Sequence, residues 1–431
     1  MTWQVETIIL IGDALTDFKH RNDCRLCGAV NLELVLPILP SPIGDAFVPK
    51  QKIGEVQNLY PLDTYICLEC GHLQNLDVVD PEILFRNYTY RTSVSLGLVK
   101  HFQKYAEAVV NELGIQKNSL VVEIGSNDGS LLKAYKALGM RVIGIDPAKT
   151  IAELATAEGV RTLPDFFSFS IAKKILAENG IVQVICANNV FAHADNINDI
   201  VKGIRMLLAP NGVFVFEVSY MPDIIDNFVF DTIYHEHVSY HALIPLERFF
   251  NRLDMSLFNV VRVATKGGSI RGFAQPMSTG KHKKTGCLKK MLDEENRRCI
   301  SHPEIYRAFY QDIEKQKRIV LEYLDYAIAG GKTVGAYGAS TTTTTLLYHF
   351  ELQKRIQLIV DDNPLKQNLY SPGEHIPVYS SSVLYSTPPD IILILAWQYS
   401  TAIMKKHECY MKNGGKFVVP LPNLKVFPQK C

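Results

Sequence analysis

A strand, a glycine-containing loop and a helix follow one another at residues 120–138, and this pattern constrains the fold more than any other part of the chain. Leu120 to Gly125 is a mostly apolar run typical of a buried strand, Ser126 to Gly129 is a tight loop, and Ser130 to Leu138 has the spacing of a helix. A second strand is expected from Arg141 to Ile145. Strands and helices that alternate in this way predict a doubly wound α/β sheet.

The loop between the first strand and its helix indicates which ligand this sheet binds. A dinucleotide fingerprint needs a third glycine for the close approach of a pyrophosphate, whereas the loop from Gly125 to Gly129 is shorter and contains Asp128, which would repel phosphate. The second strand ends on Asp146, where a carboxylate can accept hydrogen bonds from both hydroxyls of a ribose. The pattern therefore favours a nucleoside without phosphate, and NAD is the main competitor.

Four of the nine cysteines form two CxxCG motifs in the first part of the chain. Each motif can donate two thiolates from one tight turn, and two motifs together complete a tetrahedral four-cysteine zinc site. Sulfur would then fill every coordination position, so the zinc is expected to be structural and unable to activate water. The expected zinc ligands are Cys24, Cys27, Cys67 and Cys70.

Length and charge disfavour several classes of protein. A chain of 431 residues exceeds the size of one hydrophobic core, so two or three domains are expected. The net charge of +1 does not favour nucleic acid or an anionic membrane. The longest apolar run, Ile391 to Trp397, is too short to span a bilayer, and the first residues do not resemble a signal peptide. We therefore expect a cytoplasmic protein, monomeric or weakly homo-oligomeric, with no nucleic-acid or membrane partner.

A cluster of side chains that can move protons, Tyr234-His235-Glu236-His237, is either a metal site or a general base. Its two histidines are two residues apart, so they lack the helical spacing of the HExxH metal motif. The cluster follows the fifth expected strand, Gly212 to Val218, which places it near the cofactor edge of the sheet. A base is therefore favoured over a metal site, and histidines of a surface loop are the alternative.

The last third of the chain repeats the strand, loop and helix pattern. A long helix is expected from Ser301 to Ala329, with a strand at 333–337, a loop at 338–340, a helix from Thr341 and a strand at 356–360 after it. The backbone N–H groups at the start of the shorter helix, together with the hydroxyls of Ser340 and Thr341, suit a phosphate or a carboxylate. A plain strand-to-helix turn is the alternative.

The motif ValGluIleGlySerAsnAspGly at residues 122–129 resembles motif I of the class I S-adenosylmethionine methyltransferases. Over the whole chain, the cysteine motifs, the Tyr-His-Glu-His cluster and the segments Lys266 to Arg271 and Asp362 to Gln367 resemble the bacterial nucleotide-sugar C-methyltransferases of deoxysugar biosynthesis. This resemblance implies a three-part α/β protein. A zinc-binding domain would occupy residues 1–84, a doubly wound methyltransferase domain 85–283, and a Rossmann-like substrate-binding domain with its helical connector 284–431.

The resemblance also implies roles for individual residues. His237 would act as the base, Glu236 would orient or tune it, and Tyr234 would donate or relay a proton. His193 would line the pocket after the fourth strand, and Tyr88 or Tyr90 would belong to a lid. S-adenosylmethionine would be bound by Glu123, Gly125, Asn127, Asp128, Gly129, Asp146, Pro147, Asp165, Phe166, Asn188 and Asn189, and the substrate by Lys266, Arg271, Gly338, Ser340, Asp361, Asn363, Lys366 and His375.

The implied reaction is methylation of a carbon, C3 above all, of a 4-keto sugar linked to a nucleoside diphosphate. The ketone acidifies the neighbouring C–H bond, a histidine can remove that proton near neutral pH, and the enolate oxygen needs a hydrogen-bond donor. The chain departs from better-known family members at Thr341 to Thr345, where they tend to carry Lys-Gly-Asn, which leaves the contact made there undetermined. The alternatives are another sugar position or keto substrate, a non-catalytic binding scaffold, and an RNA methyltransferase.

Overall fold

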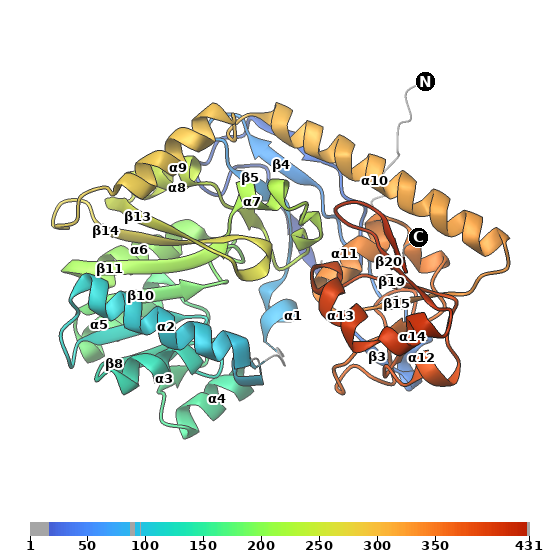
Figure 1. Ribbon diagram of the computed structural model, residues 1–431. Helices are drawn as coiled ribbons and strands as arrows, with labels where there is room; N and C mark the ends of the chain where they lie inside the picture. Colours follow the sequence, from blue (N-terminus) through green and yellow to red (C-terminus); the bar gives the residue numbers. More distant parts are fainter. Residues whose placement is uncertain (1–16, 87–90, 95, 429–431) are drawn as a thin grey trace.

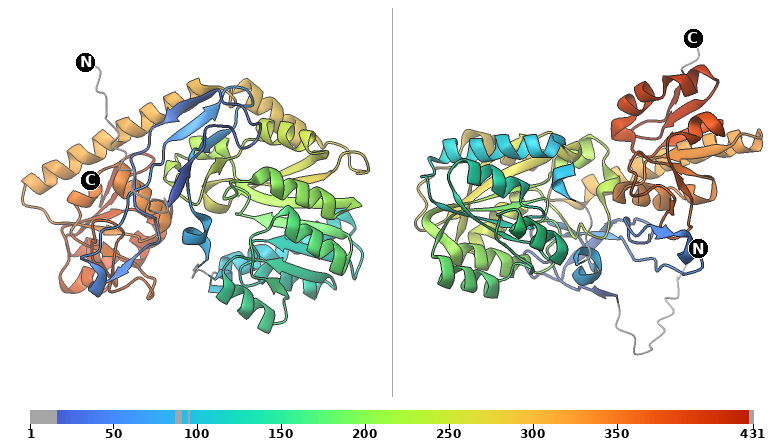
Figure 2. Two further views of the ribbon diagram at one scale, coloured as in Figure 1. Left: turned by 180° about the vertical axis from the view of Figure 1, so that it is seen from behind. Right: turned by 90° about the horizontal axis from the view of Figure 1, so that it is seen from below.

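The computed structural model describes residues 17–86, 91–94 and 96–428. Two lobes, each built on its own α/β sheet, lie side by side under the long helix α10 (Pro303–Ala329), which reaches from one lobe to the other (Figure 1). The N-terminal strands lie toward the viewer when the molecule is seen from behind, and they contact both lobes (Figure 2, left). Among the described residues, no helix is long and apolar enough to cross a membrane.

The larger sheet has seven strands in the order β13-β14-β11-β10-β7-β8-β9. β14 is antiparallel to both of its neighbours, and the remaining strands are parallel to one another. Numbered along the chain, this order is 3-2-1-4-5-7-6, so the sheet reverses direction between β7 and β10. The strands are β7 (Leu120–Ile124), β8 (Arg141–Ile145), β9 (Thr162–Leu163), β10 (Val182–Asn188), β11 (Leu208–Ser219), β13 (Met255–Val263) and β14 (Ser269–Pro276).

Helices cover both faces of this sheet because its central strands are apolar on both sides. Val121 of β7 packs in one core with Phe102 and Leu131, whereas its neighbour Val122 belongs to a second core with Ile175. Successive residues of a strand point to opposite faces, which explains the alternation. The helices are α2 (Leu96–Leu113) and α3 (Ser130–Ala137) on the first core, α5 (Phe169–Asn179), α6 (Ile197–Leu207) and α8 (Leu243–Arg252) on the second, and α4 (Lys149–Ala157) after β8.

The second sheet repeats the arrangement on a smaller scale, in the order β18-β16-β15-β19-β20-β21. Its first five strands are parallel and β21 is antiparallel, so this sheet reverses direction between β15 and β19. β16 is shorter than the predicted strand at 356–360, because only its two residues pair with both neighbours. The elements are β15 (Val334–Tyr337), α11 (Thr341–His349), β16 (Ile359–Val360), β18 (Val378–Tyr379), α12 (Val383–Ser386), β19 (Ile391–Ile394), α13 (Ser400–Lys406), α14 (Glu408–Lys412), β20 (Lys416–Val419) and β21 (Lys425–Phe427).

The N-terminal strands pair with strands from both lobes. β12 (Ser239–Tyr240) of the first lobe extends the sheet formed by β2 (Leu32–Leu36), β4 (Thr64–Cys67) and β5 (Leu73–Asn75), and β3 (Val48–Pro49) pairs with β17 (Leu369–Tyr370) of the second lobe. β1 (Phe18–His20) and β6 (Asp77–Val79) form a separate ribbon. The predicted N-terminal segment therefore shares one sheet with the middle segment and another with the C-terminal segment.

Helix α10 buries the stripe that the sequence predicts. Phe309 and Ile313 are buried, Ile305 is partly buried beside them, and the stripe continues through Val320 and Leu324. The predicted α/β architecture is thus confirmed, with two doubly wound sheets and a separate N-terminal module. The remaining helices are α1 (Pro81–Phe85), α7 (Met221–Asp226) and α9 (Gly286–Arg297), and single 3-10 turns lie at Lys50–Lys52, Thr92–Val94, Phe230–Thr232, Thr265–Gly267, Leu352–Lys354 and Trp397–Tyr399.

Candidate functional site

A cleft of about 960 Å³ lies between the two lobes. One side is formed by loops that follow β7, β8 and β10, at the carboxyl ends of the first sheet's strands. The other side is formed by loops that follow β15 and β19 of the second sheet. Ligands of doubly wound sheets bind where the strand order reverses, outside the carboxyl ends of the strands. The fold thus brings the binding edges of both sheets to one cavity.

The edge of the cleft that the first sheet forms, here called the first edge, has the features of a nucleoside pocket. The carboxylate of Asp146 accepts hydrogen bonds from the backbone N–H of Asn127 (2.8 Å) and of Ala148 (2.9 Å), which fixes it at the tip of β8. Burial raises its pKa, and these two donors oppose that shift. Of the predicted cofactor residues, the cleft is lined by Glu123, Gly125, Asn127, Asp146, Pro147, Asp165, Phe166, Asn188 and Asn189.

Asp128 and Gly129 lie behind this wall. Asp128 accepts hydrogen bonds from the backbone N–H of Ser93 (2.8 Å) and from the hydroxyl of Ser130 (2.6 Å), so its carboxylate holds the loop and the start of α3. Burial raises the pKa of Asp128, but these hydrogen bonds outweigh burial and the net pKa is lowered. The acidic residue that the sequence suggests as a barrier to phosphate is therefore turned into the loop.

Gly125 is required by the close packing of two loops at this edge. Its φ of +67° lies in the left-handed region, and a Cβ atom there would come within 2.3 Å of Val190 in the loop after β10. At Phe166, another predicted cofactor residue, the guanidinium of Arg86 lies over the ring, 5.2 Å from its centroid. Burial raises the pKa of Glu123 well above its ordinary value, and Asn188 opposes this shift.

The Tyr-His-Glu-His cluster places Tyr234, Glu236 and His237 on the cleft. His237 donates from Nδ1 to the backbone carbonyl of Thr232 (2.8 Å), and this tautomer leaves Nε2 to accept from the hydroxyl of Tyr234 (2.9 Å). Burial lowers the pKa of His237 to about 3, with Lys266 as a further cause. His237 is therefore a neutral imidazole at physiological pH.

Two neighbours complete this cluster. The ring of His193 lies 5.1 Å from that of His237 and stacks on Phe85. Burial raises the pKa of Glu236 to about 7, while Lys266 across the cleft opposes the shift. Lys266 lines the cleft from a turn in which its own φ is +52°. The surrounding protein partly desolvates its ammonium group, which lowers its pKa.

His235 turns away from the cleft, as its position one residue before Glu236 allows. Its Nε2 donates to the backbone carbonyl of Tyr60 (3.2 Å) in the N-terminal module, and burial lowers its pKa to about 4. Tyr88 and Tyr90, which the sequence suggests as lid residues, lie outside the described residues.

The second edge presents the start of α11 to the cleft. Ser340, Thr341 and Thr342 line the cavity. The side chain of Ser340 accepts from the backbone N–H of Thr343, and the hydroxyl of Thr343 accepts from the backbone N–H of Ser340. Gly338, at φ +114°, lets this loop approach the loop after β19, because a Cβ atom there would lie 2.7 Å from the Cβ of Ala396. The residues at the start of this helix therefore line the same cavity as the nucleoside pocket.

Several predicted substrate residues do not line the cleft. Arg271 is paired with Glu217 (2.8 Å from Nε) and lies over the ring of Tyr105. Lys366 is paired with Asp45 and also donates to the carbonyl of Ala339 (2.6 Å). Asp361 accepts from the N–H of Ala339 (2.6 Å), and Asp361, Asn363 and His375 do not line the cleft either, so their role at the substrate stays a prediction.

A buried carboxylate on the cleft wall gave no signal in the sequence. Asp231 is 1% exposed, and one of its oxygens accepts from the indole N–H of Trp397 (2.9 Å), which follows β19. The other oxygen has no hydrogen-bond partner among the described residues, and burial raises the pKa of Asp231 to about 7. Only the folded chain shows this pair, because 166 residues separate its members.

The four predicted zinc ligands lie together. Their Sγ atoms are within 4.8 Å of one another, with 3.6 Å between Cys24 and Cys70 and 3.5 Å between Cys27 and Cys67. Sulfurs at about 2.3 Å from a tetrahedral zinc would be about 3.8 Å apart, so the cluster fits the ion. Gly28 and Gly71 take φ of +76° and +80° and close each turn with an N–H donated to the first cysteine's carbonyl.

Comparisons with known proteins agree with this geometry. Family models match a zinc binding domain at residues 24–85, a methyltransferase domain at 98–257 and a C-methyltransferase C-terminal domain at 264–422. The C-methyltransferase NovU of Streptomyces niveus is 32% identical over 406 residues, which cover 94% of this chain and 96% of NovU. The predicted methyltransferase activity and zinc-binding module are thereby confirmed, and the nucleotide-sugar substrate stays a prediction.

Solved structures of other methyltransferases resemble part of the chain more distantly. Magnesium protoporphyrin IX methyltransferase of Synechocystis PCC 6803 with bound SAM is 14% identical at a TM-score of 0.33, covering 46% of this chain and 97% of that chain. The 1,6-didemethyltoxoflavin-N1-methyltransferase of Burkholderia thailandensis is 18% identical at a TM-score of 0.32, covering 41% and 78%. Likeness at this level carries no argument about the ligands of this chain.

Proposed function

The chain belongs to the family of C-methyltransferases represented by NovU, and we propose that it methylates a carbon next to the ketone of a nucleotide-linked 4-keto sugar, with C3 as the position. One observation carries this proposal. The binding edges of two doubly wound sheets open onto one cleft, and the segment from Asp231 to His237 lies where they meet. It contacts Trp397 of the second lobe at one end and His193 of the first lobe at the other.

S-adenosylmethionine is the ligand we assign to the first edge. The tip of β8 offers the carboxylate of Asp146 to the ribose hydroxyls, and the ring of Phe166 on the cleft wall offers a flat surface for adenine. When bound there, the cofactor supplies an electrophilic methyl group. The cleft places Tyr234 and His237 on the wall beside this pocket.

The nucleoside diphosphate part of the substrate is assigned to the second edge. The N-terminus of α11 with its hydroxyls suits a diphosphate, and Lys266 supplies a cation on the cleft wall. The oxygen of Asp231 that lacks a partner in the described chain can accept from a sugar hydroxyl, which would relieve the cost of its burial.

Proton removal is assigned to Tyr234 and His237 acting as a pair. The Tyr234 oxygen accepts the proton from the carbon next to the ketone as its own proton passes to Nε2 of His237. The electron pair of the broken C–H bond moves into the C–C bond next to the ketone, and the carbonyl oxygen takes the negative charge. The resulting carbon nucleophile is the species that a methyl donor can alkylate. Glu236, whose pKa is raised to about 7, is suited to stabilise the imidazolium electrostatically when it is ionised.

The test is incubation of the purified protein with S-adenosylmethionine and a panel of 4-keto nucleotide sugars. We expect one substrate to gain the mass of one methylene group, and solvent deuterium to enter at the same carbon when the methyl donor is omitted. Tight binding of both ligands without product would support a binding scaffold and contradict the proposal. Product with the methyl group on oxygen would contradict carbon methylation, and no deuterium at the carbon would contradict proton abstraction there.

A further inference from the structure

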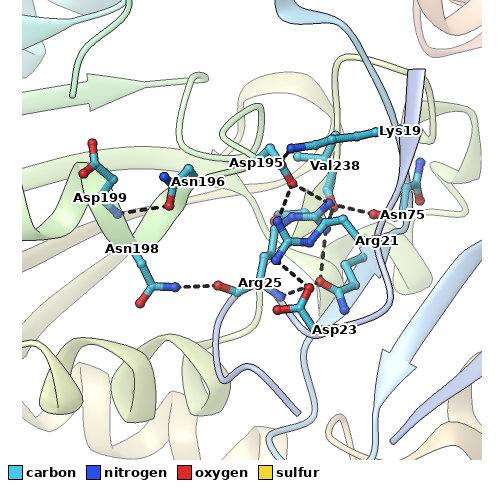
Figure 3. A network of polar contacts seen from close by, with 12 residues as sticks. Lys19, Arg21, Asp23, Arg25, Asn75, Asp195, Asn196, Asn198, Asp199 and Val238 are labelled. Carbon is cyan, nitrogen blue, oxygen red and sulfur yellow. Dashed lines mark hydrogen bonds and ion pairs between the residues drawn. The ribbon is translucent and has the colours of Figure 1, made fainter. Parts of the chain in front are cut away.

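An arginine inside the zinc module is bonded to the loops that carry both cleft histidines. Arg25 lies between the first two zinc ligands, and its side chain is 0% exposed. Its guanidinium donates to the backbone carbonyl of Val238, to that of Asn75 (2.8 Å) and to the side chain of Asp195 (3.4 Å), as Figure 3 shows. A buried guanidinium needs such partners, because an unpaired charge in the interior is very costly.

Two of these partners are neighbours of the candidate catalytic residues. Val238 follows His237 directly, and Asp195 is two residues after His193. The N–H of Val238 also donates to the carbonyl of Ala192 (3.0 Å), which joins the two loops to each other. Arg25 therefore bonds both loops at the point where the two histidine rings lie 5.1 Å apart.

Three cations surround one carboxylate in this network. The guanidinium of Arg25 is positively charged, because arginine is not deprotonated in proteins. Burial raises the pKa of Asp195, but Lys19, Arg25 and Arg21 outweigh it, and the net pKa is lowered. Lys19 lies 2.6 Å and Arg21 2.9 Å from this carboxylate. The carboxylate is thus ionised and held by three cations.

The backbone around Arg25 is itself fixed. The side chain of Asn198 donates to the carbonyl of Arg25 (2.7 Å), and Arg252 donates to the carbonyl of Leu26. The four-cysteine cluster closes the same turn from the other side. Arg25 does not line the cleft, so it has no contact with a substrate there.

We propose that Arg25 is a positioning residue that couples the zinc module to the active site by fixing the spacing of His193 and His237. This inference rests on the proposed function only for its kinetic test. It gives the zinc module a second role beyond stability: the rigid turn between two zinc ligands sets the position of the proton-transfer residues.

The test compares Arg25→Met and Arg25→Lys with Arg21→Met, which also removes a cation from Asp195 but spares the bond to Val238. All three should retain zinc, because no cysteine is changed, and this is measured by metal analysis. A displacement of catalytic groups by about 1 Å can cost about 100-fold in rate, so we expect kcat of Arg25→Met to fall about 100-fold with KM within about 3-fold. Arg25→Lys should recover part of kcat, and Arg21→Met should stay within about 3-fold of wild type.

A spectroscopic readout keeps the test independent of the substrate. In protein labelled with ¹⁵N-histidine, the ring signals of His237, identified with His237→Asn, should shift in both Arg25 variants and stay in place in Arg21→Met. Unchanged His237 signals in Arg25→Met would overturn the proposal whether or not the substrate class is right. It would also be overturned if Arg25→Met lost kcat and S-adenosylmethionine binding in equal proportion, which indicates general damage.

Discussion

His237 is held in one tautomer by two hydrogen bonds, which decides which of its atoms can take a proton. Nδ1 donates to the carbonyl of Thr232, so Nε2 is the acceptor, and the hydroxyl of Tyr234 already points at it. The sequence predicts the residue types but not this chain of donors, because the carbonyl of Thr232 belongs to a separate 3-10 turn. The structure also separates His237 from His235, whose ring is bonded to the N-terminal module.

Replacing His237 by Asn should remove the final proton acceptor. General-base catalysis contributes about 10²–10⁴-fold, so we expect kcat to fall within this range and solvent exchange at the substrate carbon to fall with it. Tyr234→Phe should also lower kcat and the rate of solvent exchange. His235→Asn is the matched control, since His235 does not line the cleft. Exchange at the wild-type rate in His237→Asn would show that another group is the base.

The pH dependence of kcat should report Glu236 and not His237. Burial lowers the pKa of His237 to about 3 and raises that of Glu236 to about 7. Ionised Glu236 favours the positive charge that His237 acquires, so kcat should rise as the pH rises through about 7. Glu236→Gln should flatten this limb. A limb near pH 7 that persists in Glu236→Gln and disappears in His237→Asn would reverse the assignment.

At the scale of elements, periodicity predicts which segments are strands and helices, but it does not predict which of them meet. The sequence places the strands around Gly125 and Gly338 correctly, as β7 and β15 show. It does not predict that β12 joins the N-terminal sheet or that β3 joins β17, because short strands carry little periodic signal. The sequence also does not predict which charges pair. It leaves Arg271 and Lys366 available for a substrate, whereas folding pairs them with Glu217 and Asp45.

Substitutions in the two glycine loops should weaken the binding of different ligands. Gly125→Ala would place a Cβ against Val190, and Gly338→Ala would place one against Ala396, both at positive φ. We expect the first to weaken S-adenosylmethionine binding by at least about 10-fold and the second to weaken nucleotide-sugar binding by a similar factor, each measured by calorimetry. Gly54→Ala is the control, because nothing lies within 4 Å of its added Cβ. Equal loss of both ligands in both variants would contradict the separate assignment of the two edges.

Zinc removal should act first on stability. Replacing Cys27 by Ser removes one thiolate ligand, so zinc content should fall, and Tm should drop by about 10 °C or more because structural zinc contributes directly to folding. Cys287→Ser, at an exposed position outside the cluster, is the control. Full zinc content with an unchanged Tm in Cys27→Ser would show that the cluster is not the metal site.

At the scale of the whole molecule, the two lobes and the N-terminal module form one site. The first sheet supplies the nucleoside pocket, the second supplies the start of α11, and the N-terminal module holds the segment between them through Arg25 and β5. The predicted segments 1–84, 85–283 and 284–431 follow the order of these parts along the chain, but their strands interleave. A sequence reveals each part from its own motif, whereas the cleft exists only once the parts are assembled.

The most direct test of carbon methylation uses S-adenosylmethionine labelled with ¹³C in its methyl group. After reaction with the keto nucleotide sugar that the panel identifies, the ¹³C spectrum should show a methyl signal coupled to a ring carbon next to the ketone. That coupling is predicted because proton removal in the cleft creates a carbon nucleophile. A labelled methyl group bound to oxygen, with no carbon–carbon coupling, would contradict it.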